Sequence, residues 1–135
     1  MSNDGSEILF GKRQAPLVYK AVDDLMTEVN NKIRMRGIAK GMVCIQEDIN
    51  KFCAKMQDCI YFASTNRDPA IRLKYIENCQ STIKLTWIRV RILLKQKALT
   101  VGEIGVLAKY AKEIERQLAA WHNATGKEIK YGQKL

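Results

Sequence analysis

The chain has 135 residues, of which 47% are hydrophobic, so it can bury one hydrophobic core and a single domain is expected. Its 23 Lys and Arg outnumber 14 Asp and Glu, and the net charge of +9 favours polyanionic partners such as nucleic acid, with an anionic membrane surface as a second possibility. From the polar start Ser2–Gly5 we expect no signal peptide. No uncharged run approaches the roughly 18 residues of a membrane span, so we expect a soluble, cytoplasmic protein.

Helical periodicity begins at Pro16, one of only two prolines in the chain. The apolar residues that follow at steps of three or four are Val18, Val22, Leu25, Val29 and Ile33. They predict a first helix that ends in the Gly37–Gly41 region. A second helix is predicted from about Gly41 to Asn66, with the seam Met42, Ile45, Ile49, Phe52, Met56, Cys59 and Ala63. Residues 1–15 show no period, and we expect them to form a flexible tail.

Asp68 and Pro69 predict the cap and first position of a third helix, which stops before Thr100. Its seam is Ile76, Cys79, Ile83, Trp87, Val90 and Leu94. Thr100 and Glu103 have the spacing of a capping box at the start of a fourth helix. The apolar positions of that helix are Ile104, Leu107, Ala111, Ile114, Leu118 and Trp121, and it is expected to fray near Gly126. Residues 127–135 would be a flexible basic tail.

No strand pattern competes with these helices. The expected fold class is all-α, an antiparallel up-down-up-down four-helix bundle over residues 16–126. The close alternation of large residues along all four seams predicts no internal cavity for a small molecule.

The third predicted helix carries more than one apolar stripe. On an ideal helix Leu85, Ile88 and Ile92 fall on a stripe separate from the core seam, and we expect another subunit to cover them as an oligomer interface. Arg89 borders this stripe, and its planar fork suits either a carboxylate across a subunit boundary or a phosphate. A cationic stripe lies alongside, formed by Lys84, Arg91 and Lys95, and no acidic residue occurs between Glu77 and Glu103.

A cluster of cations is predicted at one end of the bundle. Arg34, Arg36 and Lys40 surround the first connection between helices. In an antiparallel bundle the third helix ends beside that connection, which brings Lys95 and Lys97 close to it. Clustered cations bind phosphates by releasing counterions, so these five residues, together with Lys84, Arg89 and Arg91, are the candidate nucleic-acid-binding residues.

The sequence contains few residues in patterns that indicate catalysis or metal binding. The cysteines, Cys44, Cys53, Cys59 and Cys79, lack CxxC spacing and lie far from the single His122, so we expect buried free thiols and no metal site. No HExxH, GxSxG, Walker or dinucleotide-binding motif occurs. Because neither a nucleophile nor a general base can be nominated, we expect a protein that is not an enzyme and uses no cofactor.

Four segments carry a family resemblance: Ile83–Leu94 (IKLTWIRVRILL), Leu99–Glu103 (LTVGE), Ala111–Arg116 (AKEIER) and Leu118–Trp121 (LAAW). Together they resemble the C-terminal half of the accessory variability proteins (Avd) of diversity-generating retroelements. That family belongs to a four-helix superfamily that includes proteins encoded in intervening sequences of bacterial large-subunit ribosomal RNA genes. The chain differs from the usual family pattern at Glu115 and at Ala119–Ala120, where family members usually have glycine.

The resemblance implies a four-helix protomer of a ring-shaped homo-oligomer, a homopentameric barrel-like ring, with a positive surface. It also implies partnership with the reverse transcriptase of the retroelement and with its template RNA or cDNA during mutagenic retrohoming. The matching basic positions are Arg89, Arg91 and Arg116. We therefore expect a noncatalytic accessory protein of mutagenic reverse transcription. The alternative is a ribosomal-RNA-associated or structural bundle without a polymerase partner, and a neighbouring reverse transcriptase gene would favour the first.

Overall fold

The computed structural model describes residues 5–12, 15–37 and 40–134, and every regular element within these ranges is helical. The elements in chain order are α1 (Ser6–Phe10), α2 (Leu17–Arg36), the short 3-10 helix η1 (Lys40–Met42), α3 (Val43–Thr65), α4 (Pro69–Lys95) and α5 (Val101–Lys134). The predicted all-α class is confirmed, and the four predicted helices correspond to α2, α3, α4 and α5.

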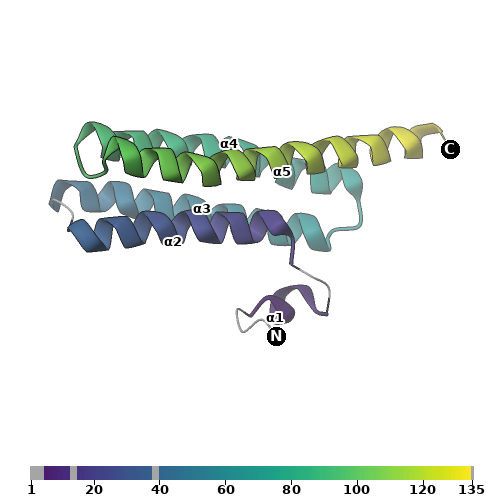
Figure 1. Ribbon diagram of the computed structural model, residues 1–135. Helices are drawn as coiled ribbons and strands as arrows, with labels where there is room; N and C mark the ends of the chain where they lie inside the picture. Colours follow the sequence, from purple (N-terminus) through teal and green to yellow (C-terminus); the bar gives the residue numbers. More distant parts are fainter. Residues whose placement is uncertain (1–4, 13–14, 38–39, 135) are drawn as a thin grey trace.

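The four long helices lie side by side and alternate in direction (Figure 1). α3 packs against α2 and α4, and α5 packs against α4 and α2, so each long helix contributes to one shared core. The largest fully buried side chains include Leu25, Ile49, Met56, Ile60, Ile76, Ile83, Leu93, Leu107, Ile114 and Leu118. In α2 and along the middle of α5 these positions follow the predicted seams, because each of these helices has one apolar stripe. In α3 the predicted seam residues Ile45 and Phe52 are only half-buried, and Cys53 and Ile60, which were not predicted, lie in the core.

The buried side of α4 differs from its predicted seam. Trp87 and Leu94 are only half-buried, whereas Thr82 and Thr86 lie in the core. The two threonine hydroxyls donate to carbonyl oxygens of their own helix, at 2.7 Å from Asn78 O and 2.9 Å from Thr82 O, so each of these two buried hydroxyls has a partner. The buried side of α4 is therefore rotated toward α3, the helix against which α4 packs most extensively.

Both predicted caps are present. The Asp68 carboxylate accepts a hydrogen bond from the Ala70 amide at 3.0 Å, with Pro69 in the first position of α4. At the start of α5 the Glu103 amide donates to the Thr100 hydroxyl at 3.1 Å, and the Thr100 amide donates to the Glu103 carboxylate at 2.8 Å. These local bonds fix where α4 and α5 begin.

The two predicted tails contain more structure than expected. Ser6–Phe10 form α1, and the buried Phe10 ring packs edge-on against Tyr19 at 5.3 Å and Tyr61 at 5.9 Å between ring centroids. The prediction that residues 1–15 lack structure is therefore wrong for this segment, because one aromatic anchor holds it to the bundle. α5 likewise continues past Gly126 to Lys134, where Glu128 accepts a 2.9 Å hydrogen bond from Arg72 of α4.

Candidate nucleic-acid interface

Two connections between helices lie at the same end of the bundle, one joining α2 to α3 and the other joining α4 to α5 (Figure 1). Arg34 and Lys40 flank the first connection, and Lys95 and Lys97 flank the second. All four side chains are exposed, and we call this set the basic end. The structure places these four predicted residues at one end of the bundle. The side chain of Arg36, the fifth predicted member, lies outside the described residues.

The local backbone presents these side chains to solvent. Lys97 has a φ of 60°, and the amides of Lys97 and Ala98 close the last turn of α4 by donating to Leu94 O at 3.0 Å and Leu93 O at 2.8 Å. A left-handed residue at this position ends a helix and turns the chain away from its axis. In the first connection Gly37 has a φ of 81°, a conformation that glycine adopts without strain.

The cations of the basic end have no anionic partner in the described part of the chain. Arg34 donates a 2.6 Å hydrogen bond to the neutral Asn31 side chain, and none of Lys40, Lys95 or Lys97 forms an ion pair with a described carboxylate. Four unneutralised charges on one surface create a positive potential that attracts phosphate groups.

The cationic stripe of α4 extends this surface along the bundle. Lys84, Arg91 and Lys95 are all exposed, and Lys84 and Arg91 also lack an ion pair with any described carboxylate. On an ideal helix the three side chains lie within about 40° of one another. Since Lys95 ends α4, the stripe and the basic end are continuous.

Arg89 differs from the other candidates because its charge is engaged within the chain. Its Nε donates to the Asp48 carboxylate of α3 at 3.2 Å, and its guanidinium lies 5.7 Å from the centre of the Phe52 ring. The carboxylate that its planar fork was expected to meet across a subunit boundary is thus supplied by α3 of the same protomer. The prediction that Arg89 is an interface residue is corrected to a contact between α3 and α4.

Arg116 is also removed from the basic end. It lies on α5, about 22 Å along the helix axis from Val101, and its Nε donates to Glu113 at 3.0 Å. Hydrogen bonds from Arg116 and then Gln117 lower the pKa of the Glu113 carboxyl to about 2, so the pair is ionised at neutral pH. The structure therefore does not join Arg116 to the other predicted nucleic-acid-binding residues.

The predicted oligomer stripe is apolar surface in the single chain. Leu85 is 42% exposed and Ile88 is 49% exposed, and Ile92 is half-buried. Lys84 and Arg91 border these aliphatic side chains, so the outward side of α4 is both apolar and cationic.

The cysteines are free thiols, as predicted, but only three are buried. Cys53, Cys59 and Cys79 lie in the core, whereas Cys44 is exposed near the start of α3 and its thiol approaches Gly41 O at 3.7 Å. Burial raises the pKa of the Cys53 thiol to about 12 and raises that of the Cys79 thiol further. Both thiols are therefore protonated at neutral pH and are poor nucleophiles. No group of three metal-ligating side chains occurs among the described residues.

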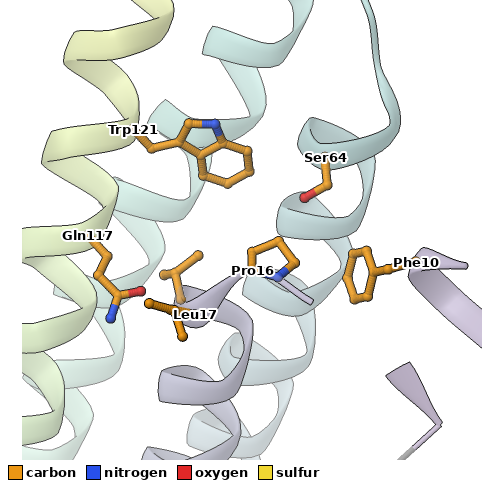
Figure 2. A pocket seen from close by; sticks show the side chains of 7 residues that line it. Phe10, Pro16, Leu17, Ser64, Gln117 and Trp121 are labelled. Atoms are coloured by element: carbon orange, nitrogen blue, oxygen red, sulfur yellow. The ribbon is translucent and has the colours of Figure 1, made fainter. Parts of the chain in front are cut away.

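A surface pocket of about 430 Å³ lies where the start of α2 meets α3 and α5, a feature that the alternation of large residues did not predict. In Figure 2, Pro16 and Leu17 face Trp121 across this pocket, with Phe10 at its edge. Its polar side chains are already engaged, since Ser64 donates to Ile60 O at 2.8 Å and Gln117 donates to Glu113 at 2.7 Å. The pocket contains no charged residue and lies at the opposite end of α2 from Arg34, so it is separate from the cationic surface.

No protein-family model, curated protein or solved structure matches the chain. In the described part of the structure, every helix is too short or too polar to cross a lipid bilayer.

Proposed function

We propose that this chain is a noncatalytic accessory protein of a diversity-generating retroelement, which binds template RNA or cDNA through its cationic surface and docks the reverse transcriptase. The observation that carries the nucleic-acid part is the basic end, where four cations from two connections meet without described carboxylate partners. The resemblance of Ile83–Trp121 to accessory variability proteins supports the polymerase partner. The polymerase performs the chemistry, and this chain supplies electrostatic attraction and positioning.

The nucleic-acid part is tested by fluorescence anisotropy with a labelled single-stranded RNA over a salt series. Affinity should fall steeply as salt rises, because each phosphate contact releases a counterion. The triple variant K40E/K95E/K97E should lose about tenfold or more in affinity at low salt. The matched control is K112E/K127E/K130E, which makes the same charge change at exposed lysines of α5. Equal losses in both variants would show attraction by net charge alone and would contradict a basic-end site.

The proposed homo-oligomer, with a pentameric ring as its expected form, uses the apolar outward side of α4. Covering Leu85 and Ile88 with a second protomer would remove them from water, which favours association. Light scattering should give a mass several times that of the 15.4 kDa chain. The double variant L85S/I88S should be a monomer, while Val101→Ser, at a residue that is 78% exposed elsewhere, should leave the mass unchanged. A monomeric wild-type protein at micromolar concentration would contradict this part.

The reverse transcriptase partner separates this proposal from the alternative of a ribosomal-RNA-associated bundle. Co-expression of the chain with the reverse transcriptase of a retroelement from the same genome should give a complex that survives size-exclusion chromatography. Template-dependent cDNA synthesis should increase when the chain is added. A chain that instead binds ribosomal RNA fragments and leaves the polymerase unbound would favour the alternative.

A further inference from the structure

A straight stripe on the outward side of α3 carries two lysines followed by an aromatic ring. Lys51, Lys55 and Phe62 are all exposed, and on an ideal helix they lie within about 40° of one another. The rise along the axis is about 6 Å from Lys51 to Lys55 and about 10 Å from Lys55 to Phe62. α3 begins at the end of the bundle that holds Lys40, so the stripe leads away from the basic end (Figure 1).

The Phe62 ring is half-exposed yet held in position. It is 48% exposed, and it stacks on Tyr75 of α4 with 5.5 Å between ring centroids and an angle of 27° between the ring planes. Tyr61 contacts it from another side at 5.5 Å, with the planes tilted by 60°. A ring fixed by two neighbours loses little conformational freedom when a ligand binds, so it is suited to accept another flat ring on its uncovered part.

The charges around this ring favour an anionic ligand. Between Ile49 and Asn66 the only acidic residue is Asp58. Lys51, Lys55 and Lys74, which is adjacent to Tyr75, are exposed and form no ion pair with a described carboxylate. An apolar protein surface placed over Phe62 would remove these ammonium groups from water without giving them partners. A nucleotide offers both a flat ring for Phe62 and a phosphate for a lysine.

We propose that Phe62 is a stacking site for an unpaired nucleobase, and that Lys51 and Lys55 bind phosphates of the same strand. This inference rests on the proposed function, because the strand reaches the α3 stripe from the basic end. Every base presents a π-face, so the site recognises single-stranded nucleic acid with little sequence preference.

The proposal is tested with two labelled oligonucleotides of equal length, a single-stranded oligothymidylate and an abasic strand that has the same phosphates. The full chain should bind the oligothymidylate about 5- to 100-fold more tightly. Phe62→Ala should abolish this difference and leave the affinity for the abasic strand unchanged, whereas Phe62→Trp should retain the difference. Tyr131→Ala, which removes an exposed ring from α5, is the matched control and should behave as wild type. Circular dichroism verifies the fold of each variant.

The charged residues of the stripe give a second measurement. K51E/K55E should weaken binding of both oligonucleotides by the same factor, since both strands carry phosphates. Asp58→Asn, which removes the acidic side chain one turn before Phe62, should strengthen binding of both by about twofold.

Three results would overturn the stacking site. These are equal binding of the two oligonucleotides by the wild type, a difference between them that persists in Phe62→Ala, and a loss of reverse transcriptase binding by this variant. If both oligonucleotides bind equally and K40E/K95E/K97E weakens both, the stacking site alone is refuted and the basic end stands. If neither oligonucleotide binds the wild type, the proposed function fails together with it.

Discussion

The distribution of polar and apolar residues between the buried and the exposed side of α4 differs from that of the other long helices. Toward the core α4 places Thr82 and Thr86 at 1% and 0% exposure, whereas toward solvent it leaves Leu85 at 42% and Ile88 at 49% exposure. The threonines are tolerated because their hydroxyls bond to carbonyls of α4 itself. The comparison teaches that fit against α3 and α5, more than hydrophobicity, decides which side of α4 is buried. It leaves aliphatic and cationic residues together on the surface.

The largest expected effect is a difference in the free energy of unfolding between alanine variants of two isoleucines of α4. Ile83→Ala should lower the free energy of unfolding by about 2–5 kcal/mol, because Ile83 is 1% exposed and its truncation leaves a cavity in the core. Ile88→Ala should change it by less than about 0.5 kcal/mol in the monomer, because Ile88 is 49% exposed. Urea denaturation at low protein concentration measures both. Equal losses would mean that Ile88 is covered even in the isolated chain.

A second pair of variants compares two arginines. Arg89→Ala should lower the free energy of unfolding by about 1 kcal/mol, since it removes the contacts with Asp48 and Phe52 of α3. Arg91→Ala should have an effect near zero on stability, because Arg91 points outward without a described partner. The same urea titrations apply. A larger loss for Arg91→Ala than for Arg89→Ala would contradict the assignment of Arg89 to the contact between α3 and α4.

A smaller effect is expected at a buried hydroxyl. Thr86→Val keeps the shape of the side chain and removes a hydroxyl that bonds only within α4. The Thr82 carbonyl oxygen, which loses the bond from this hydroxyl, is already an acceptor for the helix backbone. The free energy of unfolding should therefore change by less than about 1 kcal/mol in either direction. A loss of more than about 2 kcal/mol would show that the hydroxyl acts across the core.

The reactivity of the cysteine thiols compares exposed with buried positions. At neutral pH this measurement involves no change in stability. Cys44 should react rapidly with a thiol-specific disulfide reagent, while Cys53, Cys59 and Cys79 should react only when denaturant is added, because burial raises the pKa values of these three thiols. Counting released chromophore before and after denaturation measures this. More than one rapidly reacting thiol would indicate opening of the contact between α3 and α4.

The raised pKa of the Cys53 thiol predicts that stability depends on pH in the alkaline range. The pKa of Cys53 is about 12 in the folded chain and near 9 when unfolded, so unfolding releases a proton once the pH passes 9. The stabilisation is complete below pH 9 and declines as the pH rises toward 12. Urea titrations at pH 7 and pH 10 should show this decline, and it should be smaller in Cys53→Ala. An identical decline in the variant would assign the effect to other groups.

Sequence reasoning located the helices well because the signals it used are local. The cap at Asp68 and the capping box of Thr100 and Glu103 appear as predicted. The connection from α2 to α3 and the connection from α4 to α5 lie at the same end of the bundle, as an antiparallel arrangement requires. The segment that holds Phe10 was missed, although a run of three apolar residues between Gly5 and Gly11 was a usable signal. The exposed stripe of Lys51, Lys55 and Phe62 was also not singled out, although its spacing of four and seven residues is visible in the sequence.

The sequence by itself determined where α2, α3, α4 and α5 begin, and that the chain is cationic, because caps, periodicity and charge depend only on neighbouring residues. Only the tertiary structure decided which side of α4 is buried and which carboxylate binds Arg89. α4 has more apolar stripes than one core can cover, so its rotation depends on how well each stripe fits α3 and α5. Asp48 lies 41 residues before Arg89, and packing of α3 against α4 brings the two within 3.2 Å.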